Sequence, residues 1–529
     1  MRRHCLLILP LCAALLCAAE RTLYNGIQLP SVWPPHYEDV TAEPMPVPYL
    51  SAPPAIIPID IGRQLFVDDF LIGSTTLTRT YHQAQYIAGN PVLKPDRPYE
   101  MPRGATSMVF SDGVWFDPKD NLFKMWYMAG YTSNLAYAVS KDGIHWDKPA
   151  LDVRPGTNLV FEGYRDSTTV WLDQEEKDPM RRYKLFLMKR SPWAMELYYS
   201  PDGNHWSPRV ATTAVKMGDR STAFWNPFRR VWVYSIRAGN KRGRIRHYHE
   251  NPDAATGLGW KAGQPVPWTG ADRLDPMRAD LKTPTELYNL DAVAYESLLV
   301  GLFSIWRGQP KDRPKPNDLI VGYSRDGFHW YRPDRRPLIP VSEKKGDWNW
   351  GNIQSAGGCM LVVRDKLYFY VSGRAGVEGT SQSGVSTTGL ATLRRDGFAS
   401  MDAGGKEGTL TTRLVRFSGE HLFVNAATRG GELRVEVLDD RDRVIVPYTR
   451  KNSVVLRGDV TISEMRWKSR GDLGSLVGKP VKFRFYLKNG RLYSFWVTSS
   501  PEGASHGYVA AGGPGFTGPA DTVGAAIYR

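Results

Sequence analysis

Nearly the same heptad occurs three times in the chain, as SKDGIHW (140–146), SPDGNHW (200–206) and SRDGFHW (324–330). A fourth copy, RRDGFAS (394–400), keeps the Asp-Gly-Phe sequence but has lost the tryptophan. Asp-Gly suits a tight β-turn, because aspartate bonds to nearby backbone and glycine accepts a positive φ. The tryptophan that follows is a large apolar side chain suited to the space between packed sheets. We therefore interpret the heptad as a marker of the fold and not as a catalytic motif.

The spacing of the heptads indicates a repeat of about 60 residues. The first two copies begin 60 residues apart, the third begins 124 residues after the second, and the degenerate copy begins 70 residues after the third. One unit without the signature fits into the wide interval, where GLGW (257–260) is interpreted as its remnant. A unit of several strands that recurs five times is typical of a five-bladed β-propeller.

The composition between the heptads is that of an all-β protein. Short apolar or alternating runs such as LFKMWYM, LAYAVS and VWVYSI are separated by Gly, Asp, Asn and Pro. After residue 404 the heptads stop while alternating runs continue, which predicts an antiparallel β-sandwich. We therefore predict a five-bladed propeller over 59–404 followed by a β-sandwich over 405–500.

The two ends of the chain differ from the rest in amino-acid composition. Residues 1–19 combine a basic start, an apolar stretch and a small-residue cleavage site near Ala19, which is the pattern of a secretory signal peptide. The stretch is too short for a good membrane span, so we expect export to the periplasm or the medium. Dense prolines predict an extended linker over 20–58, and we expect the Gly/Ala-rich tail over 501–529 to wrap loosely or fray.

Cysteine and charge counts exclude several classes of protein. Cys359 is the only thiol left after signal cleavage, so an intrachain disulfide and a cysteine metal cage are excluded. The formal charge is +14, but the basic residues are scattered and form no block. We interpret the charge as general surface bias, with affinity for an anionic polymer as the alternative, and we expect no nucleic-acid partner.

Polar residues precede or begin every predicted inner strand of the propeller. Such segments converge on the central axis, where a binding funnel forms. The candidate catalytic acids in these segments are Glu100, Asp166, Asp219, Glu286 and Asp291. The candidate substrate-binding residues are Arg103, Arg165, Arg220, Asn289, Asn352, Gln354 and Trp350.

Acids gathered at one end of an axis favour glycosidic bond cleavage. One carboxyl group protonates the leaving oxygen, a second attacks the anomeric carbon or activates water, and a third can tune the donor. The alternative without a catalytic role is a set of salt bridges between blades, most obviously for Asp166 and Asp219, which each adjoin an arginine. Aromatic faces for sugar rings are expected from Tyr99, Trp171, Trp225, Trp348 and Trp350.

A further pair of acids lies in LFVDDFLI (65–72), before the first full blade. We expect this stretch to supply the strand that closes the ring, with Asp69 as an additional catalytic candidate.

The runs RQLFVDDFLI, SxDGxxW, MGDRSTAFWNPF and NWGNIQSAGG resemble secreted bacterial proteins related to glycoside hydrolase family 32. The architecture is similar to families 32 and 68, and in the propeller alone to family 43, over about residues 59–500. By blade order, the resemblance implies Glu100 or Asp69 as base or nucleophile, Asp166 as orienting acid, and Asp219 or Asp291 as proton donor. The WMNDPNG, RDP and Glu-Cys motifs of family 32 are missing, so the resemblance implies the fold and not a fructosidase.

The sequence thus predicts an exported glycoside hydrolase acting on a poly- or oligosaccharide, and we expect a monomer. No metal is required, although oxygen ligands on the axis would suit a structural Ca²⁺. Carboxyl separations of about 5–5.5 Å would favour retention and about 6.5–9.5 Å inversion. The rival class is a non-catalytic propeller that binds glycans or assembles on the cell surface. A sialidase is less favoured, because the heptad is one residue shorter than the Asp-box and no triple-arginine clamp is evident.

Overall fold

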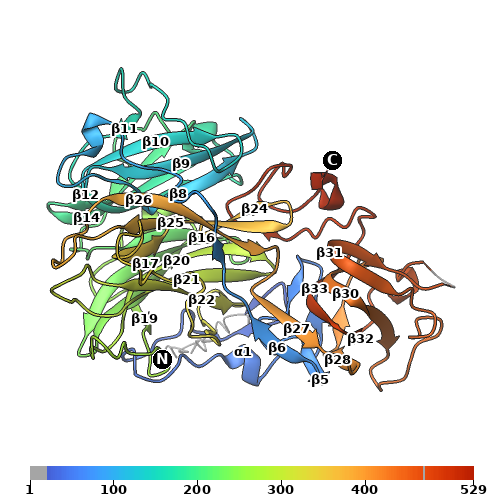
Figure 1. Cartoon of the computed structure of the whole chain (residues 1–529). Coiled ribbons are helices and arrows are strands. Elements are labelled where there is room, and N and C mark those ends of the chain that lie inside the picture. Colours follow the sequence, from blue (N-terminus) through green and yellow to red (C-terminus); the bar gives the residue numbers. More distant parts are fainter. Residues whose placement is uncertain (1–20, 469–470, 529) are drawn as a thin grey trace, which may run out of the picture.

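The computed structural model describes residues 21–468 and 471–528, and the predicted signal peptide lies outside this range. Five antiparallel sheets stand around one axis and form a five-bladed β-propeller, with a second β domain beside it (Figure 1). The predicted fold class is confirmed. Within the described residues, no helix has both the length and the apolar character needed to cross a membrane.

Each of the first three blades is a four-stranded meander whose inner strand comes first in the chain. Blade 1 contains β8 (Ser107–Asp117), β9 (Leu122–Ala129), β10 (Asn134–Ser140) and β11 (Leu159–Phe161). Blade 2 contains β12 (Arg165–Leu172), β13 (Tyr183–Arg190), β14 (Trp193–Ser200) and β15 (Ala211–Thr212). Blade 3 contains β16 (Thr222–Asn226), β17 (Val231–Asn240), β18 (Gly243–Asn251) and β19 (Val266–Gly270).

Blades 4 and 5 each take a strand from a distant part of the chain. Blade 4 contains β20 (Glu286–Glu296), β21 (Leu298–Trp306), β22 (Asn317–Ser324) and the tail strand β34 (Tyr508–Val509). Blade 5 contains β23 (Asn352–Ser355), β24 (Leu361–Val363), β25 (Lys366–Arg374), β26 (Ser386–Arg394) and the early strand β7 (Gln85–Tyr86). Short helical turns complete the propeller at η1 (Pro98–Glu100), η2 (Pro179–Arg181) and α2 (Ala254–Gly257).

The ring is closed by β7, which pairs with β26 through Tyr86 and Ala391. The prediction that residues 65–72 supply the closing strand is wrong. That stretch begins with β4 (Gln64–Leu65), which pairs with β33 (Gly490–Thr498) of the second domain. A pattern of apolar residues identifies a strand but not its partner, because the partner depends on the path of the whole chain.

The heptad is a turn motif at the end of the third strand of a blade. In the first copy, Ser140 Oγ accepts from the Gly143 N–H at 2.9 Å, and Asp142 Oδ1 accepts from the N–H groups of Ile144 and His145. Trp146 then packs edge-on against Tyr370 of blade 5, with 5.6 Å between ring centroids. The heptad therefore joins neighbouring blades.

The second domain is one nine-stranded sheet folded on itself into a sandwich. Its strands lie in the order β5 (Ile72–Thr75), β28 (Gly408–Thr412), β32 (Lys482–Lys488), β30 (His421–Leu438), β33, β27 (Ala399–Ala403) and β6 (Thr78–Tyr81). β31 (Leu456–Met465) pairs with β30, and β4 with β33. The first half of β30 pairs with β33 and its second half with β32, so this strand crosses between the layers. Phe417, Phe483, Phe485 and Phe495 fill the space between them. In Figure 1 the blue strands β5 and β6 lie among the orange and red strands of this domain.

The N-terminal segment wraps around the propeller as an extended chain. It contains β1 (Arg21–Thr22), β2 (Gln28–Leu29), α1 (Pro48–Ser51) and β3 (Ile57–Pro58), which runs parallel to β29 (Val415–Arg416). Tyr24 stacks on Phe228 with 4.4 Å between ring centroids, and the hydroxyl of Tyr37 lies 2.9 Å from Nε2 of His329.

The C-terminal tail is packed and does not fray, contrary to expectation. β34 pairs with the end of β20, and Ala510 N–H donates to the Ala294 carbonyl of blade 4 at 3.1 Å. Ala511 donates to the carbonyl of Met360 in blade 5 and accepts from the N–H of Phe116 in blade 1. The tail therefore lies across the far ends of three blades and covers that end of the axis. Two further turns, η3 (Gly474–Leu476) and η4 (Gly524–Tyr528), complete the described chain.

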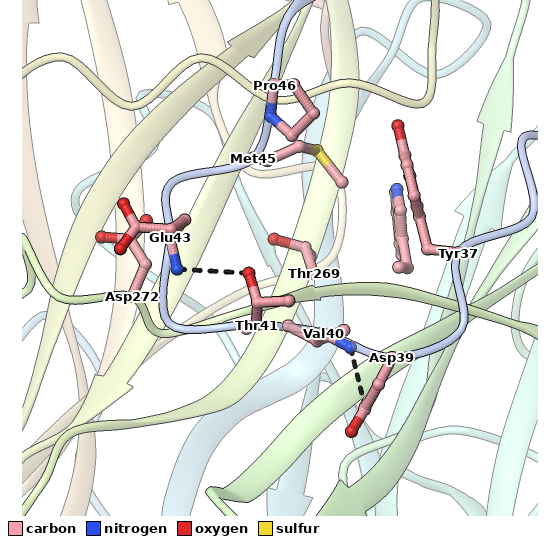
Figure 2. Close-up of a pocket in the computed structure, with 11 residues that line it drawn as sticks. Tyr37, Asp39, Val40, Thr41, Glu43, Met45, Pro46, Thr269 and Asp272 are labelled. Atoms are coloured by element: carbon pink, nitrogen blue, oxygen red, sulfur yellow. Dashed lines mark hydrogen bonds between the residues drawn. The ribbon is translucent and has the colours of Figure 1, made fainter.

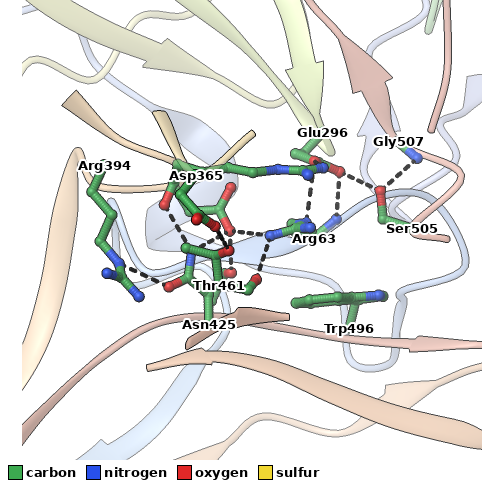
Figure 3. Close-up of polar contacts among 12 residues, drawn as sticks. Arg63, Glu296, Asp365, Arg394, Asn425, Thr461, Trp496, Ser505 and Gly507 are labelled. Atoms are coloured by element: carbon green, nitrogen blue, oxygen red, sulfur yellow. Dashed lines mark hydrogen bonds and ion pairs between the residues drawn. The ribbon is translucent and has the colours of Figure 1, made fainter. Parts of the chain in front are cut away.

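A buried ion-pair network centred on Arg63 joins the two domains (Figure 3). Arg63 Nη1 donates to Asp396 Oδ2 at 3.0 Å and to the carbonyl of Thr461 at 2.8 Å. Its Nε lies 3.3 Å from Glu296 Oε1, and its guanidinium lies 4.2 Å from the ring centroid of Trp496. Asp396 comes from the degenerate heptad, so the copy that lost its tryptophan has become an interdomain contact.

Arg395, the neighbour of Asp396, extends this network to the C-terminal tail. Its Nη2 lies 3.0 Å from Asp521 Oδ2 and 3.3 Å from Glu296 Oε1. Ser505 Oγ donates to Glu296 Oε2 at 2.6 Å. The interface between the domains and the C-terminal tail are therefore held by the same network of buried charges.

We expect Asp396→Ala to lower the free energy of unfolding by about 3–5 kcal/mol, because it removes one of the two carboxylates that compensate the buried Arg63 guanidinium. Asp396 also accepts hydrogen bonds from Ser494 and Asn425, which lose their partner at the same time. Urea unfolding monitored by tryptophan fluorescence measures the change.

The control is Asp69→Ala, which removes an exposed ion pair with Arg79 and should cost less than ~1 kcal/mol. Burial alone would raise the pKa of Asp396, but Arg63 and Arg395 outweigh it and hold the pKa at about 2, below the unfolded value of 3.8. The contribution of Asp396 is therefore full above about pH 4 and lost as pH falls toward 2. Equal losses in the two variants would contradict a central role for Asp396.

Candidate functional site

Polar side chains of the inner strands meet at the propeller axis. There Asp291 Oδ2 accepts hydrogen bonds from Ser111 Oγ at 2.8 Å, Ser355 Oγ at 2.6 Å and Asn289 Nδ2 at 2.9 Å. These groups come from β8, β20 and β23, so one carboxylate oxygen ties three blades together. Asp291 is only 4% exposed.

Arg220 and Asp166 connect the other two blades to this carboxylate. Arg220 Nη2 donates to Ser111 Oγ at 2.9 Å, and the Arg220 backbone N–H donates to Asp166 Oδ1 at 3.2 Å. The guanidinium of Arg220 lies 3.9 Å from the ring centroid of Phe110. We call Ser111, Asp166, Arg220, Asn289, Asp291 and Ser355 the axial cluster. It contains the predicted residues Asp166, Arg220, Asn289 and Asp291.

Two members of the axial cluster have backbones in the left-handed region. Ser111 has φ 63° within a bulge of β8, and Arg220 has φ 59° just before β16. Such conformations cost about 1–3 kcal/mol each and are concentrated at functional sites. A bulge redirects a side chain that a regular strand would point elsewhere, and here it aims Ser111 toward Asp291.

Arg165 forms a buried ion pair instead of a free binding group. Its Nη1 and Nη2 lie 2.8 and 2.7 Å from the two carboxylate oxygens of Asp112. Burial raises the pKa of Asp112 to about 6, and the charge of Arg165 offsets this only in part. Arg165 therefore positions the start of β12.

Asp219 and Glu286 lie at the rim, each beside an arginine. Asp219 Oδ1 is 3.4 Å from Arg237 Nε, and Glu286 Oε2 is 4.0 Å from Arg244 Nε. Their side chains are 29% and 22% exposed. The salt-bridge alternative therefore describes Asp219, although its partner is not the neighbouring Arg220.

Two predicted acids lie apart from the axial cluster. Glu100, in η1, is fully buried and accepts hydrogen bonds from Lys148, from the Tyr127 hydroxyl and from the Asp96 and Arg97 N–H groups. Asp69 is 68% exposed, pairs with Arg79 of β6 and belongs to the second domain. Both acids were predicted from their order along the chain, and that order does not determine the direction in which a side chain points.

Of the remaining predicted binding residues, three are buried and one is exposed. Gln354 Nε2 donates to Asn352 Oδ1 at 2.9 Å, and Asn352 Nδ2 donates to the Lys315 carbonyl at 2.9 Å. Trp350 is buried beneath the guanidinium of Arg313. Arg103 lies exposed on the rim.

The predicted aromatic sugar platforms serve packing instead. Trp171 and Trp225 lie at the far end of the axis, where they line a cavity of about 40 Å³ with Tyr508 of the tail. Trp348 lies against Gly373 and Gly389, where a Cβ atom would clash with its ring. The hydroxyl of Tyr99 donates to Asn158 at 2.5 Å.

Three residues that sequence reasoning missed border the mouth, namely Tyr131, Lys315 and Arg374. Arg374 ends β25, the second strand of blade 5, opposite Asn352 at the start of β23. In an antiparallel pair, the end of one strand lies beside the start of its neighbour, so second-strand ends also face the mouth. That rule would have identified Arg374 from the sequence.

The mouth includes a cavity of about 490 Å³ lined by Arg103, Tyr131, Ser383 and their neighbours. Arg374 lies under this wall, 5.4 Å from the ring centroid of Tyr131 and 3.4 Å from Ser383 Oγ through Nη1. Across the mouth, Lys315 Nζ donates to the Tyr288 hydroxyl at 2.9 Å.

A second cavity of about 220 Å³ lies between the N-terminal segment and β19, away from the axis (Figure 2). All three of its acids already have partners: Asp39 accepts from Asn240, Glu43 pairs with Arg273, and Asp272 pairs with Arg332 and Arg335. This cavity belongs to the wrap and not to the candidate site.

No family model and no curated protein matches the chain. Several solved structures resemble it. An N-acetylgalactosamine deacetylase from F. plautii in complex with blood group B trisaccharide has 14% identity and a TM-score of 0.38, over 61% of this chain and 96% of that one. A fructofuranosidase from Schwanniomyces occidentalis complexed with fructose has 11% identity and a TM-score of 0.35, over 75% and 98%. A structure described under the GH130 family of mannoside phosphorylases has 13% identity and a TM-score of 0.39, over 59% and 94%. Resemblance at this level assigns neither a family nor an activity.

We expect the stability of the protein to fall by on the order of 2 kcal/mol as pH rises from about 4 to 6, in a step that depends on Asp112. The raised pKa means that the folded state holds a proton there which the unfolded state has already released. Urea unfolding across this pH range should show a flatter profile for Asp112→Asn. Identical slopes for both proteins would contradict the assignment.

Proposed function

We propose that the protein is an exported glycoside hydrolase that cleaves poly- or oligosaccharides at the propeller mouth. The observation that carries the proposal is that hydrogen bonds of Ser111 and Arg220 connect Asp291 and Asp166, two acids from different blades. Two carboxyl groups oriented by fixed donors are the minimum that acid/base cleavage of a glycosidic bond requires.

Asp291 is suited to the base or nucleophile role, because three donors fix one of its oxygens and orient the other. Asp166 supplies the second carboxyl group, held by the Arg220 N–H. In the reaction, one water is consumed, the anomeric C–O bond breaks and the leaving oxygen receives a proton. Buried acceptor atoms without a partner among the described residues, Asn289 Oδ1 and Gln354 Oε1, are available to sugar hydroxyls.

Export, a monomeric state and family 32 kinship belong to the proposal on the basis of the sequence alone. The basic and apolar start of the chain supports export. A structural Ca²⁺ on the axis stays a prediction.

The burial of the two carboxylates favours one alternative, a non-catalytic propeller that binds glycans at its rim. Asp291 and Asp166 are 4% and 7% exposed, so a substrate reaches them only if the mouth opens. The rim itself offers Arg103 and Arg190 stacked on the exposed ring of Tyr164.

The test is a screen of the purified protein against diverse glycans, followed by Asp291→Asn and Asp166→Asn. We expect each substitution to lower kcat by about 10²–10⁴-fold, because an amide neither transfers a proton nor attacks the anomeric carbon. Reducing-sugar release measures the rate.

Asp69→Asn is the matched control and should retain full turnover, since its side chain lies on the second domain. Unchanged turnover in both axial variants would refute their assignment. Binding of a glycan without any cleavage would favour the alternative.

A further inference from the structure

The axial cluster is surrounded by more positive than negative charge. Three nearby arginines have a carboxylate partner: Arg165 pairs with Asp112, Arg237 with Asp219, and Arg244 with Glu286. Besides Arg103 and Arg190 on the rim, four cations in this region form no ion pair within residues 21–468 and 471–528: Arg220, Arg246, Arg374 and Lys315. Against them stand two unpaired carboxylates, Asp166 and Asp291, which leaves an excess of two positive charges.

Several donors of these cations are buried without a partner. Arg220 is 1% exposed, and its Nε and Nη1 have no acceptor among the described residues. Arg246 Nη2 donates to the Arg220 carbonyl at 2.8 Å, whereas its Nη1 lacks a partner, as does Nε of Arg374. A buried charge without compensation costs several kcal/mol, so such groups need an explanation outside the fold's own contacts.

Three of the cations form a path from the cavity to the axis. Arg374 lies behind Tyr131 and Ser383 of the cavity wall, and both Arg374 and Arg220 stack on the Phe110 ring, at 5.5 and 3.9 Å. Lys315 is half-buried, and among the described residues its ammonium group donates only to the Tyr288 hydroxyl.

The local potential is consistent with this excess. Arg374 lowers the pKa of the Tyr131 hydroxyl despite its burial. Burial, and then the charge of Arg220, lowers the pKa of Arg246 to about 9. An anion placed between these groups would offset the cost of burying their positive charges and would reduce the repulsion between them.

We propose that the mouth binds a saccharide that carries an oxyanion, either the carboxylate of a uronic acid or a sulfate ester, through Arg374, Lys315 and Arg220. Guanidinium groups match both oxyanions with paired N–H donors, and the lysine adds a point charge. This inference rests on the proposed function only in taking a saccharide as the ligand, and it names the substrate class of that site.

The test compares matched saccharides that differ only in charge. One arm uses an oligogalacturonide and its methyl ester, and the other uses a sulfated oligosaccharide and its desulfated form. Calorimetric titration of Asp291→Asn protein separates binding from cleavage. We expect the charged member of one arm to bind at least about tenfold more tightly than its neutral form, with a preference that shrinks as salt rises. The arm that shows this preference identifies the oxyanion.

In that arm, Lys315→Gln and Arg374→Gln should each weaken binding of the charged saccharide about tenfold and leave the neutral one unchanged. Lys141→Gln is the matched control, because it removes the same charge from an exposed residue in the heptad turn on the far face. We expect it to bind both saccharides as the parent protein does.

Equal affinity for charged and neutral members in both arms would overturn the inference, as would an equal loss of both in Lys315→Gln. Tight binding of the charged saccharide without cleavage by the wild-type protein would overturn the proposed hydrolase and leave the oxyanion site standing. Cleavage of neutral saccharides with no preference for charge would overturn the oxyanion site and leave the proposed hydrolase standing.

Discussion

The buried charges around Arg63 are the constraint on which both domains depend. One guanidinium from the N-terminal segment meets Glu296 at the end of an inner strand and Asp396 of the degenerate heptad. Arg395 carries the same network to Asp521 in the tail. Because none of these side chains reaches water, each charge is tolerated only while its partners stay in place. Propeller, sandwich and both chain ends therefore have to adopt one relative position.

This arrangement also defines the candidate site. The tail covers one end of the axis, so the inner strands open only at their starting end, where Asp291 and Asp166 lie under a ring of arginines and tyrosines. Charges at the bottom of a narrow, poorly hydrated mouth act more strongly than charges on an open surface. Burial makes the positive charge of Arg220 costly in the folded state, and the same burial strengthens the attraction of that charge for an anionic ligand.

The heptad spacing predicted the propeller correctly because a turn motif repeats with the supersecondary unit that it ends. Strand partnership over long distances was not predictable, as β4 and β7 show, since local patterns carry no information about a partner three to four hundred residues away. Among site residues, Asp291 and Asn289 followed from strand starts. Glu100 misled, because its segment turns into η1 and buries the carboxylate against Lys148. Ser111 was hidden by a bulge, and Arg374 lay on a second strand.

Two blades contain a strand from a distant part of the chain, and this affects folding during synthesis. Blade 5 uses β7 from the beginning of the chain, and blade 4 uses β34 from its last residues. Early blades can therefore assemble while translation continues, but the ring closes only after β26 has been made and has paired with β7, and β34 joins blade 4 later still. A nascent chain presents unsealed strand edges until that moment.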